Sequence, residues 1–282
     1  MIIKPLIKTV EADPVARDAR LKALLEGTPP VSQVGTDGVV SRLSNGYLFT
    51  NISLAPGRNA DVELHGLITD TNKQVLKQSH TAWLAHQGAD KLPSSRLLYQ
   101  LQRTCYLNRQ NPSLQTVVDE CMTGLRENYQ QFFLYTASDI AYSGARGIIN
   151  HHDGASTPQP VAIPEFTAED EWWTSLELAP EQPPARLGTV HSLPANAHPV
   201  LEQLFGQGYV DVGAVMQYAS KPLADGNLPK VCFFTPTAKG RQQWPQRALV
   251  LGVYDDGRFG IGAVGGSSRP ARGVAVRKIF SP

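Results

Sequence analysis

Apolar residues recur at intervals of three and four in two central segments, and this periodicity predicts two amphipathic helices. The first predicted helix runs from Ser94 to Leu107 and starts behind Pro93. The second runs from about Pro112 to Tyr135. Its aromatic residues fit a stripe that faces the core, with a base-stacking or cofactor surface as the alternative. A shorter helical pattern covers residues 16–27.

Elsewhere the pattern predicts strands joined by turns. Residues 45–57 and 59–70 contain apolar positions with polar neighbours, and the turn-forming pair Pro56 and Gly57 lies between them, so we expect two paired strands. Residues 247–254 and 258–264 predict a hairpin, and residues 272–280 predict a third strand beside it. Residues 1–45 otherwise predict a weakly organised segment.

Length and hydrophobic content allow a sizeable core, because the chain has 282 residues and 41% of them are hydrophobic. No apolar run approaches the roughly 20 residues that span a bilayer. Charges at Glu11 and Asp13 stand where a signal peptide would be apolar. We therefore expect a cytoplasmic protein without membrane contact. Cys105, Cys121 and Cys232 are widely spaced, which favours buried thiols over disulfides or a zinc site.

Charge is distributed unevenly along the chain. Residues 165–181 carry acidic side chains without Lys or Arg, whereas the chain from Lys221 onward is strongly basic. A basic face attracts polyanions and releases counterions from phosphate backbones. The candidate nucleic-acid-binding residues are Lys221, Lys230, Lys239, Arg241, Arg258, Arg269 and Arg272. The alternative is that these are ordinary surface charges, partly neutralised by the acidic stretch in the folded protein.

The acidic stretch also holds an aromatic pair, Trp172 and Trp173. One interpretation is a short helix that begins at Thr167, with acidic residues in its first turn. The other is a surface for a protein partner, because tryptophan is typical of binding hot spots.

Only one cluster indicates enzyme chemistry. His151, His152 and Asp153 are residue types that bind metals or move protons near neutral pH. Neighbouring side chains on an extended backbone point to opposite sides, so the two histidines are a poor fit to one metal ion, and a surface loop is the preferred interpretation. The chain lacks the nucleophile-elbow, phosphate-loop and dinucleotide-binding motifs. No catalytic residue, metal site or cofactor is therefore predicted.

Residues 199–244 give the chain its clearest family pattern. An amphipathic run with Leu201 and Leu204 ends at Gly208, apolar residues from Tyr209 to Val212 and from 231 to 234 follow, and 235–241 starts a polar segment. This order resembles the last third of a winged-helix domain. The resemblance implies a recognition helix, a two-stranded wing carrying Lys221 and Lys230 for phosphate contacts, and a closing helix. The glycine-rich segment 258–273 is also similar in composition to a loop of the RNA-processing subunits of CRISPR systems.

Together these patterns predict a mixed α+β protein. The expected parts are the weakly organised segment 1–45, a strand-and-helix domain over 46–160, an acidic proline-rich linker over 161–196, and a basic domain over 197–282. The last domain would join the degenerate winged helix to a small antiparallel sheet. The leading functional prediction is a non-enzymatic protein that contacts DNA or RNA, as a regulator or as a subunit of a defence or mobile-element complex. The alternatives are a protein-assembly subunit and a metal-dependent enzyme.

Overall fold

The structure, a computed structural model, describes residues 38–55, 58–68, 74, 77, 79–85, 91–131, 134–152, 158, 160–179, 198–206, 212–220, 230–243, 245–253, 257–264 and 274–279. The helices are α2 (His80–Leu84), α3 (Ser95–Asn108), α4 (Gln115–Gln131), α5 (His198–Phe205), α6 (Val212–Ala219) and α7 (Ala238–Gln243). The strands are β1 (Val39–Leu43), β2 (Gly46–Ala55), β3 (Arg58–Leu67), β4 (Leu134–Ser143), β5 (Arg146–His151), β6 (Pro160–Ala162), β7 (Thr167–Ala168), β8 (Trp173–Ala179), β9 (Val231–Pro236), β10 (Gln246–Val253), β11 (Phe259–Val264) and β12 (Val274–Ile279).

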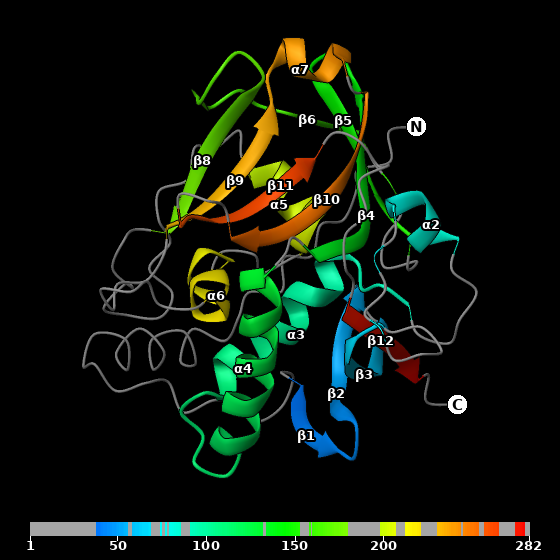
Figure 1. Cartoon of the computed structure of the whole chain (residues 1–282), viewed down its shortest axis with the longest axis vertical. Helices are drawn as coiled ribbons and strands as arrows, with labels where there is room; N and C mark the ends of the chain where they lie inside the picture. The colour runs from blue at the N-terminus through cyan, green and yellow to red at the C-terminus, as the bar shows by residue number, and fades with distance from the viewer. Residues whose placement is uncertain are drawn as a thin grey trace, which may run out of the picture.

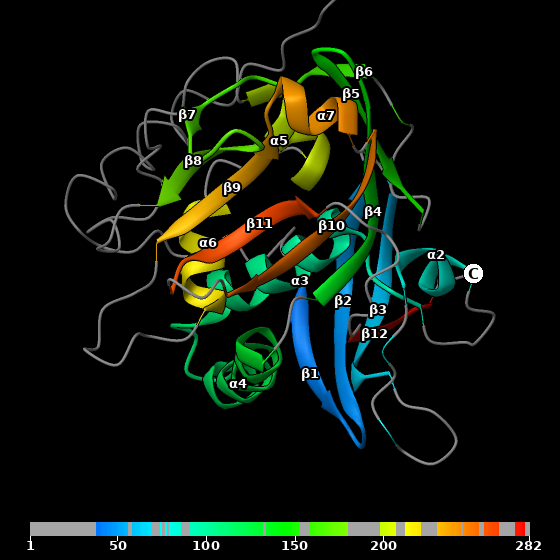
Figure 2. The same cartoon turned by 45° about the horizontal axis from the view of Figure 1, so that its top comes forward.

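The fold is mixed α+β, as the sequence predicts (Figure 1). A four-stranded antiparallel sheet has the order β1-β2-β3-β12, and an eight-stranded sheet has the order β6-β5-β4-β10-β11-β9-β8-β7. Within the larger sheet, β9 and β11 run parallel, and the other pairs are antiparallel. Figure 2 shows this sheet curling around α5 and α6.

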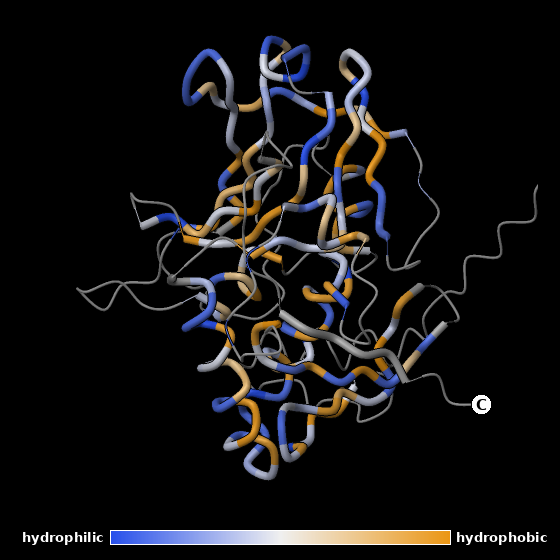
Figure 3. Tube along the Cα trace, turned by 45° about the vertical axis from the view of Figure 1, so that its right-hand side comes forward, coloured by the Kyte–Doolittle hydropathy of each residue, from blue (hydrophilic) through white to orange (hydrophobic). Residues whose placement is uncertain are grey.

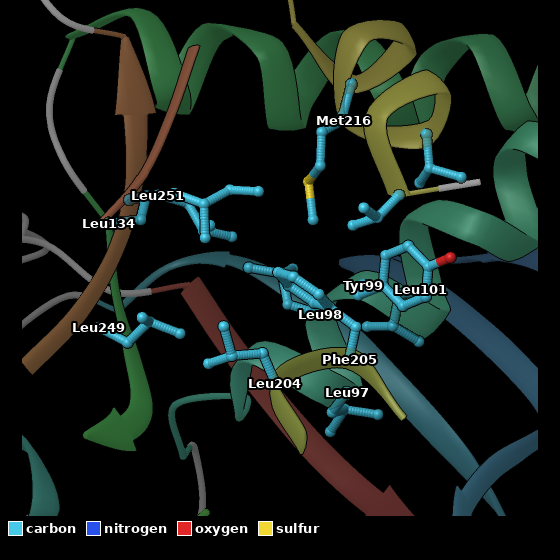
Figure 4. Close-up of a cluster of buried hydrophobic side chains, with 14 of the residues drawn as sticks. Leu97, Leu98, Tyr99, Leu101, Leu134, Leu204, Phe205, Met216, Leu249 and Leu251 are labelled. Carbon is cyan, nitrogen blue, oxygen red and sulfur yellow. The ribbon is translucent and has the colours of Figure 1, made fainter. Parts of the chain in front are cut away.

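Helix α3 lies at the centre of the molecule and contacts both sheets as well as α4, α5 and α6 (Figure 2). It forms where the sequence predicts it, because the Ser94 side chain accepts a hydrogen bond of 3.1 Å from the Leu97 amide and so caps the first turn. The side chains that pack around α3 come from β4, α5, α6 and β10. Figure 4 shows Leu97, Leu98, Tyr99, Leu101, Leu134, Leu204, Phe205, Met216, Leu249 and Leu251 in this core.

The predicted strand pairs are confirmed in part. β2 and β3 pair across the predicted turn, and β10 and β11 form the predicted hairpin. The third C-terminal strand, β12, pairs with β3 and not with the hairpin, which is a correction. Strands from both sides of residue 160 therefore share both sheets. The division into separate domains stays a prediction that these pairings do not support.

Three other local expectations are wrong. Residues 39–43, which belong to the segment expected to be weakly organised, form β1. The second predicted helix ends earlier than expected, because Tyr135 lies in β4. Thr167 begins the short strand β7, because Asp170 accepts hydrogen bonds from the Trp172 and Trp173 amides and closes a turn into β8. The helical pattern over residues 16–27 lies outside the described residues.

The two faces of β4 differ, and this difference positions the candidate site. Leu134, Ile140 and Tyr142 face the main core, whereas Tyr135 and Ala137 pack in a second cluster with Trp83 of α2. Alternation of hydrophobic and hydrophilic residues is visible along the strands in Figure 3. Asp139 shares the face of Tyr135 and Ala137, and α2 lies beside β4 at this face (Figures 1 and 2).

Among the described residues, no helix combines the length and the apolar character needed to cross a membrane.

Candidate functional site

Asp139 is a carboxylate buried in a mostly apolar strand, with only 1% of its surface exposed. Three side chains donate hydrogen bonds to it. His152 Nε2 lies 2.6 Å from Oδ2, Asn150 Nδ2 lies 2.7 Å from Oδ1, and Gln246 Nε2 lies 3.3 Å from Oδ2. These donors come from β5, the residue after it, and β10, so the pairing of three adjacent strands assembles the cluster. Such donors offset the cost of burying a charged carboxylate.

His152 is the exposed member of this cluster, with 38% of its side chain accessible to solvent. Its backbone amide donates to the Ala137 carbonyl at 2.8 Å, which extends the pairing of β4 with β5 by one residue. Because the Asp139 carboxylate accepts the hydrogen bond from Nε2, that nitrogen carries a hydrogen, and in the neutral ring Nδ1 then carries the lone pair. The ring is thus held in one tautomer by a buried acid.

His151 points to the opposite side, as the sequence predicts. Its Nδ1 lies 2.8 Å from the Ser138 hydroxyl and its Nε2 lies 2.8 Å from the Gln203 carbonyl. Ser138 also accepts from the Ser95 amide at 3.0 Å, so the buried His151 ties β5 to β4, α3 and α5. His151 is therefore a structural residue.

The expected surface loop at this point is wrong for Asn150 and His151, which belong to β5. Asp153 lies outside the described residues, so its role stays open. The carboxylate that does contact His152 is Asp139, which sequence reasoning missed. The available signal was an acidic residue within the strand-like alternation of residues 134–142.

His80 lies next to His152, with ring centroids 6.4 Å apart, and its ring lies 5.3 Å from that of Tyr135. It is buried, and Nε2 is 2.9 Å from the Thr136 carbonyl. Burial lowers the pKa of His80. The bond to Thr136 and the charge of Asp139 oppose this effect in part, while His152 adds to it. His80 is therefore favoured in its neutral form.

The residues of this cluster do not make a conventional metal centre. Within the described part of the chain, no group of three or more His, Cys, Asp or Glu side chains is placed to bind a metal ion. What the arrangement offers is a tautomerically fixed imidazole at the surface, backed by a buried carboxylate. That pairing is typical of groups that accept and return protons.

The described cations of the predicted basic surface form ion pairs within the fold. Each of these cations lies against a carboxylate of the acidic stretch, at nitrogen–oxygen distances of 2.5 to 3.7 Å. The pairs are Lys230–Glu177, Lys239–Glu171, Arg241–Glu165 and Arg258–Glu169. Lys221, Arg269 and Arg272 lie outside the described residues. Within the fold, carboxylates of the acidic stretch thus largely neutralise the described cations of the basic segment.

The two tryptophans each lie beneath a cation. Lys239 Nζ is 4.4 Å from the centre of the Trp172 ring, and the Arg247 guanidinium is 4.4 Å from that of Trp173. Arg247 is fully buried and donates to the carbonyls of Ala263 and Gly240. Both indoles are partly buried. A protein-binding surface at these tryptophans stays a prediction.

The elements expected from the winged-helix resemblance are present only in part. Residues 231–236 form a strand and residues 238–243 form a short helix. However, β9 pairs with β8 and β11, and Val212, expected in the first wing strand, begins α6. Tyr209 and Val210 lie outside the described residues. The winged-helix resemblance stays a prediction.

The three cysteines are buried and free, as the sequence predicts. A hydrogen bond with Cys121 and burial raise the pKa of Cys105, and burial raises that of Cys232. The thiols of Cys105 and Cys232 are therefore poor nucleophiles.

Comparison of the chain with protein-family models, with curated proteins and with solved structures finds no match.

Proposed function

We propose that the protein is an enzyme in which His152, oriented by Asp139, transfers a proton to or from a bound substrate. The observation that carries this proposal is the contact between a partly exposed imidazole and a buried carboxylate at 2.6 Å. This is the third functional class considered from the sequence, with Asp139 in place of Asp153 and with no metal required.

The physical basis is the fixed charge of Asp139. A carboxylate held by Asn150 at Oδ1 and by His152 and Gln246 at Oδ2 cannot rotate freely, so it fixes the imidazole plane. It also stabilises the imidazolium that forms when Nδ1 takes a proton. Proton transfer by a positioned side chain typically contributes about 10²–10⁴-fold to a rate.

The proposal is tested by assaying the purified protein against a panel of activated carboxylic esters, amides and phosphodiesters. We expect turnover of at least one class, and we expect His152→Gln and Asp139→Asn each to lower kcat by about 10²-fold or more. The control is His65→Gln, because His65 also contacts a carboxylate, Glu63 Oε2 at 3.1 Å, but lies on β3 in the other sheet.

Two results would refute the proposal. One is an absence of turnover across the whole panel. The other is an activity that His152→Gln and His65→Gln reduce equally, since that pattern would reflect general damage to the fold.

The second candidate is the nucleic-acid-associated function predicted from charge, and the observation that favours it is the basic bias of the chain after Lys221. Its test is fluorescence anisotropy with single-stranded and duplex oligonucleotides at several salt concentrations. Salt-dependent binding that is lost on joint replacement of Lys221, Arg269 and Arg272 by alanine would support it. Location in the cytoplasm likewise stays a prediction.

A further inference from the structure

We infer that the acidic segment 165–177 covers a binding surface for single-stranded nucleic acid, and that phosphates must displace its carboxylates for binding to occur. This inference rests on the second candidate function and adds to it a mechanism of self-inhibition. The surface consists of Lys230, Lys239, Arg258 and Trp172, and the covering carboxylates are Glu169, Glu171 and Glu177.

The first support is that one segment supplies a carboxylate partner to each of the three cations. Glu171 contacts Lys239 at 2.5 Å, Glu177 contacts Lys230 at 3.7 Å, and Glu169 contacts Arg258. The cations precede β9, lie on α7, or precede β11, whereas the acids lie between β7 and β8 or on β8. A single short stretch of chain thus faces basic residues from three separate elements.

The second support is the geometry at Arg258. Its Nη1 is 2.9 Å from Glu169 Oε1 and its Nη2 is 3.5 Å from Oε2, so the two planar groups meet fork to fork. A phosphate presents two oxygens to arginine in the same way. The guanidinium also lies over the Phe234 ring, 4.9 Å from its centre. Glu169 therefore occupies the position that a phosphate would take.

The third support is the aromatic ring at the surface. Trp172 is partly exposed, and Lys239 Nζ lies 4.4 Å from the centre of its ring. Bases of a single strand stack on such rings while cations beside them contact the backbone. Bases of a duplex are stacked on one another, so this combination favours single strands.

The fourth support is that two of the three covering ion pairs are exposed and therefore weak. In two of the pairs both side chains are well exposed, at 56% and 58% for Lys239 and Glu171 and at 41% and 45% for Lys230 and Glu177. Exposed ion pairs of this kind contribute little to stability, because water solvates both partners. A polyanion can replace them and gain the entropy of counterion release. Arg241 is excluded from this surface because its own side chain is buried, with only 6% exposed.

The experiment compares the whole chain with a variant that carries Glu169→Gln, Glu171→Gln and Glu177→Gln. The probe is a fluorescein-labelled oligothymidylate, and anisotropy is measured from 50 to 200 mM salt. We expect the variant to bind at least tenfold more tightly at 50 mM salt. We also expect a steeper dependence of log K on log salt, by about 0.7 for each cation released.

The matched control carries Glu120→Gln, Glu127→Gln and Glu202→Gln, which change net charge equally but lie on α4 and α5. A gain in this control equal to that of the test variant would show that net charge alone is responsible, and would overturn the inference. Unchanged affinity in the test variant would also overturn it, whether or not the wild-type protein binds.

Two further measurements separate this inference from its alternatives. Adding Lys239→Gln and Arg258→Gln to the test variant must remove the gain, because these cations are the proposed phosphate ligands. Thermal melting by circular dichroism checks that both triple variants are folded. Wild-type binding with no gain in the test variant would refute the covering role alone, whereas no binding by any variant would refute the nucleic-acid function as well.

Discussion

The contact between Glu165 and Arg241 offers the sharpest test of how far the acidic stretch supports the fold. Glu165 Oε1 accepts two hydrogen bonds, from Arg241 Nη2 at 2.9 Å and from the Ala238 amide at the start of α7 at 3.0 Å. The Arg241 side chain is only 6% exposed. Glu165→Gln removes the charge while keeping the size of the side chain. We expect this variant to lower the free energy of unfolding.

The magnitude follows from the burial of the two partners. Hydrogen bonds to charged groups contribute about 1.5–3 kcal/mol when both partners are shielded. Glu165 is half exposed, at 51%, and water will replace part of its interaction. We therefore expect a loss of about 1–2 kcal/mol, below the 3–5 kcal/mol typical of breaking a fully buried pair.

The matched control is Glu171→Gln, which breaks the pair with Lys239. Both of these side chains are more than half exposed, so the expected loss is about 0.5 kcal/mol or less. Urea unfolding followed by circular dichroism gives both values, provided that the m value is unchanged. At about 1 M salt the Debye length is about 3 Å, so the control effect should vanish while most of the Glu165 effect remains.

Equal losses in Glu165→Gln and Glu171→Gln would refute this reasoning, because burial would then have no influence on the strength of the pairs. A loss below about 0.3 kcal/mol for Glu165→Gln would refute it as well, since water would then replace the carboxylate completely.

Three further changes test other parts of the structure. Ser94→Ala removes the cap that the Leu97 amide uses, and urea unfolding should show a loss of about 1 kcal/mol; Ser41→Ala, an exposed strand position, should stay within about 0.5 kcal/mol. Gly240→Ala places a methyl group 2.5 Å from the Trp172 carbonyl oxygen, so the melting temperature should fall, by an amount equivalent to about 1–3 kcal/mol; an unchanged value would show that α7 shifts freely. Burial lowers the pKa of His80 below 6.5, so the unfolded chain binds the proton more readily and unfolding free energy should fall as pH drops below about 6.5. His80→Gln should flatten this pH dependence between pH 7.5 and 5.5, and an unaltered slope would contradict the assignment.

The local sequence was sufficient to predict elements whose structure is determined by their own residues. The periodicity that follows Pro93 predicted α3, and a turn between two strand patterns predicted the pairing of β2 with β3. The sequence after Thr167 does not decide between two structures, because its acids fit a helix start as well as a turn. The Asp170 side chain accepts hydrogen bonds from two backbone amides, and these bonds stabilise the turn. They are known only from the folded structure.

Long-range relations could not be predicted in the same way. The apolar pattern of β12 would fit the edge of either sheet. Its own residues therefore do not determine its pairing with β3, which depends on packing in the folded protein. The candidate site has the same limitation. Asp139 meets His152 only because β4 and β5 pair in one register, and Gln246 joins them only because β10 pairs with β4. The sequence shows an acidic segment and a basic segment, but it does not show that their side chains form ion pairs.

The position of β12 has a consequence for the synthesis of the protein. β3 must wait for a partner that lies about 200 residues further along the chain, and closing so large a loop makes folding slow. At the usual pace of translation, about 5–20 residues per second, one edge of β3 stays open for about 10 to 40 seconds. Unpaired strand edges are sites where nascent chains associate with one another. We therefore expect the yield of native protein in cell-free synthesis to depend on chaperones that hold this edge until β12 leaves the ribosome.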